Sequence, residues 1–212
     1  PDAPADSWKL IYDPKVVAQM AGCGLSVVDA PSEVIATALM AMGKDPNDLS
    51  PESLSAAEKL LLGMRPSVRK IDYLTQIEDL ANGSQCLLVT WPAYVIRARV
   101  RARESGREVD FRYVIPKEGT IRWIDTLTIP ADAPNRAEAH AFIDFLMHAD
   151  VAARNANFIG TPSANSAALP MIDEALRADP NVYPTAEVRA KLVSLRARTQ
   201  EESRLENRVW TR

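Results

Sequence analysis

Short apolar stretches alternate with helix-starting signals through the first half of the chain, and this alternation constrains the fold more than any other feature. The apolar stretches predict buried strands at Leu25–Val28, Val68–Asp72 and Gln85–Trp91. Helix starts are predicted at Asp13-Pro14, at Asp29 to Pro31, at Ser50-Pro51 and at Pro92, with a short helix over Leu74–Ala81. Because each connection is long enough for a crossover helix, the pattern predicts an α/β fold, with an open parallel sheet covered on both faces.

The pattern changes after Gly106. Two strands are predicted at Val109–Ile115 and Ile121–Ile129, followed by an amphipathic helix over Arg136–His148. A shorter helix near Asp150 and further helical segments complete the chain. We expect the two-strand stretch to be the place where the chain crosses from one lobe to another.

Composition argues against several classes of function. The chain is 47% hydrophobic and 25% charged, which is ordinary for a globular protein, and its net charge of −3 indicates no nucleic-acid or anionic-membrane partner. The Arg-rich run from Arg97 to Arg107 is interpreted as the solvated face of a helix. No apolar stretch approaches the roughly 20 residues of a membrane span. Residues 1–6 have neither the basic nor the apolar region of a signal peptide, and the chain has no initiator Met, so we expect a processed or truncated product.

No residue pattern predicts catalysis or a cofactor. The common nucleophile, phosphate-loop, dinucleotide and zinc-protease motifs do not occur, so we expect neither an enzyme nor a bound cofactor. His140 and His148 are the only histidines, and without further ligands nearby they are expected to be exposed residues of one helix and not a metal site. Cys23 and Cys86 are either two buried thiols or one disulfide, and spacing leaves both open.

Trp123 and Asp125 are the most informative pair in the second half. Alternate residues of a strand share a face, so the two side chains would lie together on an otherwise apolar face. An acid there needs a partner. That partner is either an Arg or water at the strand end, or an organic cation that Asp125 neutralises and the Trp123 ring contacts.

Trp91 and Glu33 repeat this combination of an aromatic ring and an acid. Trp91 ends a predicted strand, at the carboxyl edge where α/β sheets place ligands. Glu33 lies in the first turn of the helix that follows another strand, where the helix dipole alone would also favour an acid. Two tryptophans and two acids at strand ends suit an elongated cation, which needs apolar walls for its methylenes and carboxylates for its amines.

At these residues the chain resembles the bacterial putrescine/spermidine-binding proteins, the periplasmic receptors of polyamine ABC transporters. The resemblance runs from Ser7 to Arg212. It is carried by the segments SWKLIYDP, GLSVVDAPSEV, DLANGSQCLLVTW, YVIPKEGTIRWIDTLTIPADAPNRAEAHAFIDFLMHADVAA and YPTAEVRAKL.

This resemblance implies a type II periplasmic-binding-protein fold, with the ligand held between two lobes. The chain would be the carboxy-terminal portion: residues 1–112 the main part of the second lobe, 113–165 the hinge strands and the returning part of the first lobe, and 166–212 helices that pack on the second lobe. The opening of the first lobe would be missing, so the chain alone is expected to bind weakly and to dimerise or exchange strands.

The resemblance also assigns individual residues. Glu33 corresponds to the acid at the start of the second-lobe helix, Trp91 to the tryptophan that stacks on the polyamine, and Trp123 and Asp125 to the aromatic and the carboxylate of the returning strand. Three positions depart from the pattern: Tyr94 replaces an acid, Tyr73 a serine and Thr161 a tyrosine. Cysteines at Cys23 and Cys86 in some relatives support a disulfide.

The function implied is capture of a polyamine in the periplasm and its delivery to the membrane permease of an ABC transporter. Because Tyr94 removes one carboxylate, a spermidine-like amine with one strongly held end is favoured over putrescine. The alternative is that the same scaffold binds a cationic or zwitterionic solute other than a polyamine, such as an amino-acid derivative.

Overall fold

The computed structural model describes residues 3–212, and its internal contacts divide them into two compact units. Unit 1 comprises the residues up to Arg122 together with Ala186–Arg212, and unit 2 comprises Trp123–Thr185. The assignment of residues 1–112, 113–165 and 166–212 to lobes stays a prediction. That assignment groups residues 166–185 with the carboxy-terminal helices. In the structure these residues contact the helices of unit 2.

Unit 1 is built on a three-stranded parallel sheet. Its strands are β1 (Leu25–Val27), β2 (Val68–Ile71) and β3 (Leu87–Val89), and β1 lies between the other two. Both pairings are parallel, with Leu25 opposite Leu87 and Val27 opposite Val89. The three predicted strands and the parallel α/β class are therefore confirmed.

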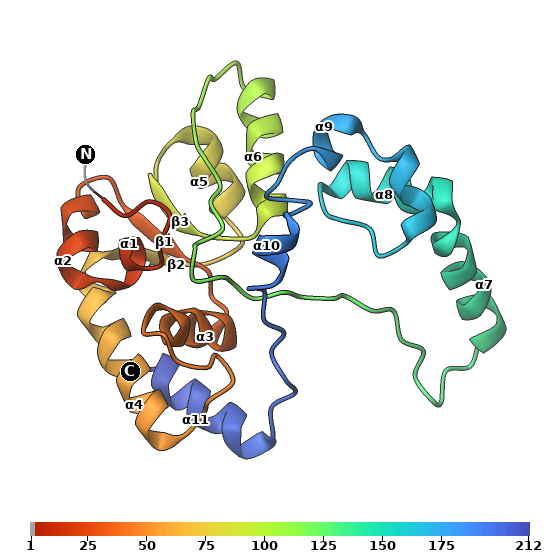
Figure 1. The fold of residues 1–212 in the computed structure, drawn as a ribbon. Coiled ribbons are helices and arrows are strands. Elements are labelled where there is room, and N and C mark those ends of the chain that lie inside the picture. The colour runs from red at the N-terminus through yellow and green to blue at the C-terminus, as the bar shows by residue number, and fades with distance from the viewer. Residues whose placement is uncertain (1–2) are drawn as a thin grey trace. The chain divides into compact units, whose positions relative to one another are not determined.

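Helices cover both faces of this sheet (Figure 1). The helices of unit 1 are α1 (Lys9–Tyr12), α2 (Pro14–Val17), α3 (Pro31–Ala41), α4 (Pro51–Met64), α5 (Gln76–Asn82), α6 (Pro92–Glu104), α10 (Ala186–Arg189) and α11 (Gln200–Trp210), with short 3-10 turns at Ala18–Met20 and Arg65–Ser67. Leu25 and Val27 face the core formed with α1 to α4, whereas Ser26 points to the α5 side. This alternation is what a strand buried on both faces requires.

The helix starts follow the predicted capping signals. Proline occupies the first turn of α2, α3, α4 and α6, where its missing N–H costs nothing. The short helix α5 begins at Gln76, two residues later than predicted. The cause is Asp72, whose carboxylate accepts hydrogen bonds from the backbone N–H groups of Leu74 and Thr75 and so holds both in a turn. Hydrogen bonding, chiefly from the Thr75 hydroxyl, also lowers the pKa of Asp72.

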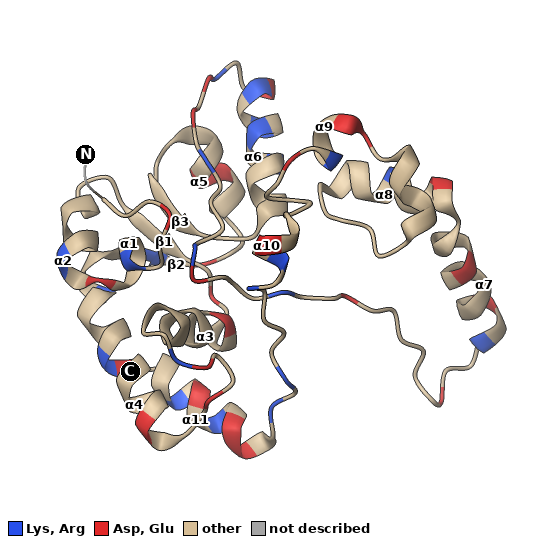
Figure 2. Cartoon of the chain, in the orientation of Figure 1, with Lys and Arg blue, Asp and Glu red and all other residues tan. Residues whose placement is uncertain are grey.

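One arginine of the Arg-rich helix departs from the predicted solvated face. Figure 2 shows the basic residues along α6, and Arg101 pairs with Glu78 at the surface over 2.9 Å. Arg99 is only partly exposed, and its guanidinium lies 5.6 Å from the centre of the Phe111 ring. It also donates a hydrogen bond to the Phe111 carbonyl at 3.3 Å. Arg99 therefore attaches the chain that follows α6 to the helix itself.

The two strands predicted at 109–115 and 121–129 do not form in the described residues. The chain there is extended, with a single parallel bridge between Ile121 and Val193. Its backbone bonds run from Arg122 N to Val193 O and from Val193 N to Thr120 O. A strand needs a neighbouring backbone along its length, and only this one contact supplies it here. That prediction was wrong.

Helix α11 carries one partner of a buried ion pair and is linked through that residue to α3. Glu206 accepts from Arg198 at 3.1 Å and from the hydroxyl of Ser32 at 2.9 Å. The side chains of Arg198 and Glu206 are only 9% and 3% exposed. Because Ser32 precedes Glu33 in the first turn of α3, this network fixes the end of the helix that carries Glu33.

Unit 2 is helical and has a small core. It contains α7 (Arg136–Met147), α8 (Ala149–Ile159), α9 (Glu174–Arg177) and a 3-10 helix at Ser166–Met171. The predicted helix over 136–148 ends at Met147, because His148 has extended backbone angles and caps α8. The buried cluster consists of Ala153, Ala156, Ala168 and Ile172. Among residues 3–212, none of the helices combines the length and apolar character that crossing a bilayer demands.

We expect Glu206→Ala to lower the free energy of unfolding by about 3–5 kcal/mol, because it leaves the buried Arg198 guanidinium without its counter-charge. Replacing both partners, as Arg198→Met with Glu206→Leu, should cost much less. Urea denaturation of the single and double variants measures both values. Glu201→Ala, an exposed change on the same helix, is the control. A single variant that is no less stable than the double variant would contradict this role for the pair.

Candidate functional site

The carboxyl ends of the three strands bring candidate residues from distant parts of unit 1 together. After β1 the chain enters α3, whose first turn contains Glu33. Tyr73 follows β2, and Trp91 follows β3 as the residue preceding α6. Since all three strands run in parallel, these residues emerge at one edge of the sheet, where open α/β sheets bind ligands.

Glu33 and Trp91 are joined directly. The indole Nε1–H of Trp91 donates a hydrogen bond to Glu33 Oε2 at 2.9 Å, and both residues are partly buried. The bond fixes the orientation of the ring beside the carboxylate. It also satisfies the polar end of Trp91 while the rest of the ring packs against the core of α1 to α4.

Two tyrosines flank Trp91. The ring of Tyr94, in the first turn of α6, lies 5.2 Å from that of Trp91, and the ring of Tyr73 lies 6.2 Å away on the chain after β2. Both pairs meet edge to face, a favoured geometry for aromatic rings. Four of the predicted site residues therefore form one cluster of three rings and one carboxylate within unit 1.

Tyr113 lies close enough to Glu33 to be influenced by its charge, and the sequence reasoning missed it. Burial raises its pKa to about 12, and the nearby charge of Glu33 adds to the effect. The ring packs against the α5–α6 core with Phe111, which Arg99 holds in place. The alternation of Phe111 and Tyr113 is a signal that could have identified it, but this alternation predicts a strand at 109–115 and does not indicate a residue near Glu33.

Gln76 was also missed. Its side chain is fully buried in α5, and Nε2 donates to the Val89 carbonyl at 3.0 Å, two residues before Trp91. The bond joins α5 to the end of β3. Among the described residues, Gln76 Oε1 and the Thr90 hydroxyl oxygen are buried without a protein hydrogen-bond partner.

The remaining predicted residues belong to unit 2. Trp123 is 52% exposed, Asp125 is exposed, and the neighbouring Ile124 and Leu127 are 67% and 60% exposed. Side chains at both odd-numbered and even-numbered positions are exposed, so neither face of this segment is buried, whereas the predicted strand would have one apolar buried face. Thr161 is partly buried and follows Gly160, which ends α8 with a positive φ of 80°. Their joint role with the unit 1 cluster stays a prediction.

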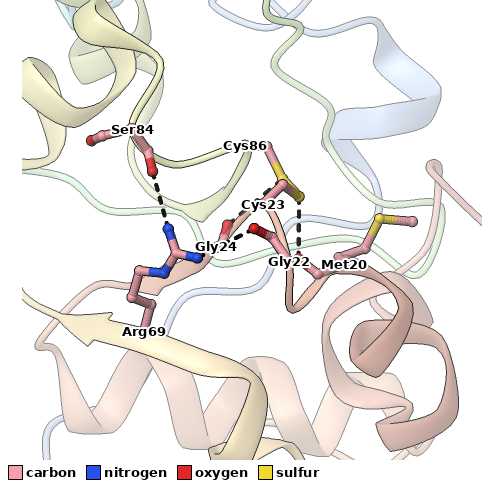
Figure 3. The surroundings of a disulfide bond; sticks show 7 residues. All are labelled: Met20, Gly22, Cys23, Gly24, Arg69, Ser84 and Cys86. Atoms are coloured by element: carbon pink, nitrogen blue, oxygen red, sulfur yellow. Dashed lines mark hydrogen bonds between the residues drawn. A yellow bond between two sulfur atoms is a disulfide. The ribbon is translucent and has the colours of Figure 1, made fainter.

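A disulfide joins Cys23 and Cys86 before β1 and β3, at the ends of these strands remote from the cluster (Figure 3). The Cα atoms are 5.5 Å apart and the two residues are 63 positions apart in sequence. Arg69 on β2 spans the same two loops, donating to the carbonyls of Gly22 at 3.3 Å and Ser84 at 3.5 Å. Of the two alternatives left by spacing, the disulfide is the one found.

The parallel α/β fold and the cluster of three rings and one carboxylate are typical of a class of α/β ligand-binding proteins. They do not identify the ligand. Residues 4–180 match the family described as bacterial extracellular solute-binding protein. The chain belongs to this family.

Several individual proteins similar to this chain have names that state a ligand. The chain is 39% identical over its whole length to the putrescine-binding periplasmic protein PotF of Escherichia coli (strain K12), and 35% identical to a putrescine/agmatine-binding protein of Pseudomonas aeruginosa. A solved protein of Listeria monocytogenes, assigned to spermidine/putrescine ABC transport, superposes on the whole chain with a TM-score of 0.86 at 26% identity. The chain spans 57% and 58% of the two relatives and 62% of the solved chain.

We expect the Cys23→Ser/Cys86→Ser variant to lose about 4 kcal/mol of unfolding free energy, because the bond closes a long loop in the unfolded chain. Guanidinium denaturation of the variant and of the unmodified chain measures the loss. The unmodified chain treated with dithiothreitol is the matched control and should reproduce the value. Equal stability of oxidised and reduced protein would refute a stabilising role for the bond.

Proposed function

We propose that this chain is part of an extracytoplasmic solute-binding protein that captures a polyamine for import by an ABC transporter. The observation that carries the proposal is the hydrogen-bonded Trp91–Glu33 pair, flanked by tyrosines at the carboxyl edge of the sheet. The names of the relatives support the substrate class, and the description of the family as solute-binding supports binding as the mode of action.

The chemistry of the cluster suits an aliphatic amine. Glu33 provides the counter-charge for one ammonium group, which is a stronger interaction than a neutral hydrogen bond. The aromatic rings provide apolar contact for the methylene chain and attract a cation to their faces.

The other end of the ligand is assigned to unit 2. We propose that Asp125 binds the second ammonium group, that Trp123 contacts the methylenes and that Thr161 borders the same site. Closure of two lobes around the ligand would then stabilise the form that the membrane permease recognises, in the periplasm. We expect the 212-residue chain by itself to bind weakly and to self-associate.

Glu33→Gln tests the proposal directly. The change keeps the shape and the capacity to accept from Trp91 but removes the charge, so the affinity for spermidine and putrescine should fall by about 10-fold or more. Asp125→Ala should reduce the affinity further than Glu33→Ala. Isothermal titration calorimetry at millimolar amine measures these values.

The matched control is Glu78→Gln, which removes the same charge from a surface ion pair with Arg101. It should leave the affinity unchanged. Equal losses in the Glu33 and Glu78 variants would mean that only the overall charge matters, and the assignment of Glu33 would fail.

A second candidate function is binding of a cationic or zwitterionic solute other than a polyamine. It is favoured by Tyr73 and Tyr94, which place rings beside Trp91 where polyamine receptors resembling this chain carry a serine and an acid. Rings favour cations that are weakly hydrated over compact primary ammonium groups.

A panel of ligands in a thermal-shift experiment separates the two candidates. Polyamine capture predicts that spermidine raises the melting temperature more than agmatine or a betaine does at equal concentration. The reverse order, abolished by Tyr94→Asp, would favour the second candidate.

A further inference from the structure

A small cavity in unit 1 is lined by residues other than those of the proposed amine site. It has a volume of about 70 Å³ and lies between the sheet, α4 and the end of α11, two helices that lie side by side (Figure 1). Its walls are mainly apolar, and β1, α3, α4, β2 and α11 contribute to them through Val27, Val34, Leu61, Val68 and Val209. None of the predicted ligand-binding residues is among the described residues that line it.

The volume of this cavity limits the group that it can hold. An apolar cavity of roughly 150 Å³ admits benzene, and the cavity of unit 1 is less than that size. A branched aliphatic group of about three or four carbon atoms therefore suits it better than an aromatic ring does. The cavity is not fully enclosed, so the rest of such a molecule can extend to the surface.

Two large apolar side chains that line the cavity are exposed. Leu62 on α4 is 48% exposed, and Ile71 at the end of β2 is 39% exposed. Single exposed apolar residues are normal, but these two adjoin an apolar cavity. Apolar walls with a few polar groups at defined positions are typical of sites for small molecules.

The charged residues of the cavity leave one positive charge without a counter-charge. Glu58 and Arg212 pair with each other at 2.9 Å, so their charges balance. Arg65 is exposed and donates to the Val68 carbonyl at 3.4 Å, and within residues 3–212 it pairs with no carboxylate. A guanidinium has several donors in one plane, which suits it to a carboxylate.

The wall that α11 contributes is held in place by two side-chain contacts. Trp210 lines the cavity, and its indole N–H donates to Asp29 Oδ1 at 2.9 Å. Arg212 is held by its pairing with Glu58. The cavity is therefore formed by ordered side chains, and a ligand that enters it has little of the protein to order.

We infer that this cavity is a second ligand site, for a short branched aliphatic carboxylate. The branched end of the molecule occupies the apolar cavity, and its carboxylate accepts hydrogen bonds from Arg65. The positive charge of Arg65 disfavours a cation, so the site differs from the proposed amine site in the charge of its ligand. It stands whether or not Glu33 binds an amine.

A nitrogen-15 NMR titration of the chain with 3-methylbutanoate tests the inference, because the Trp210 indole reports on the cavity. We expect a saturable shift of the Trp210 resonance, with the resonances of Trp8 and Trp91 unmoved. The uncharged 3-methylbutan-1-ol has the same branched end and should bind about fivefold more weakly. An alcohol that binds as tightly as the acid would overturn the assigned class of ligand.

Arg65→Gln should weaken binding of the acid about fivefold, to the affinity of the alcohol, because it removes the charge and keeps the cavity. Arg103→Gln is the matched control, since it removes the same charge near the end of another helix of unit 1, α6, and should leave the affinity unchanged. A Trp210 resonance that stays in place up to the solubility limit of the acid would overturn the inference. Equal losses in the two variants would overturn it as well, because only the overall charge would then matter.

Discussion

Parallel pairing of β1 with both β2 and β3 is the constraint on which the rest of unit 1 depends. Because the strands run in the same direction, each connection must cross a face of the sheet as a helix, and all three strands end at one edge. That edge carries Glu33, Tyr73 and Trp91, which are distant in sequence. The disulfide lies toward the opposite ends of β1 and β3 and therefore stabilises the sheet without occupying the site.

The site also depends on side-chain contacts made by helices α11 and α5. Ser32, one residue before Glu33, donates a hydrogen bond to Glu206 of α11, which in turn pairs with the buried Arg198. Gln76 holds the end of β3 from the α5 side. Helices from both faces of the sheet thus fix one small group of rings and one carboxylate, and an immobile cluster loses less entropy when a ligand binds.

Sequence reasoning succeeded where the signal was local. Strand and helix positions in unit 1 follow from apolar runs and from prolines at first turns, and strand ends located Glu33 and Trp91. It failed where the outcome depends on distant partners: segments 109–115 and 121–129 have strand composition, but in the described part of the chain the bridge between Ile121 and Val193 is the only strand pairing that either segment makes. Gln76 was missed because its role arises from a hydrogen bond to the Val89 carbonyl, which no spacing rule encodes, and Tyr113 was missed because its alternation with Phe111 predicts a strand.

We propose that the Trp91–Glu33 pair contacts a bound amine. The indole N–H resonances in a nitrogen-15 NMR titration with spermidine test it most directly, because the chain has four tryptophans. Trp8 and Trp210, whose indoles donate to Gly119 and Asp29, are internal controls. We expect a saturable shift of the Trp91 resonance, with the Trp8 and Trp210 resonances unmoved. A Trp91 resonance that stays in place at millimolar spermidine would contradict it.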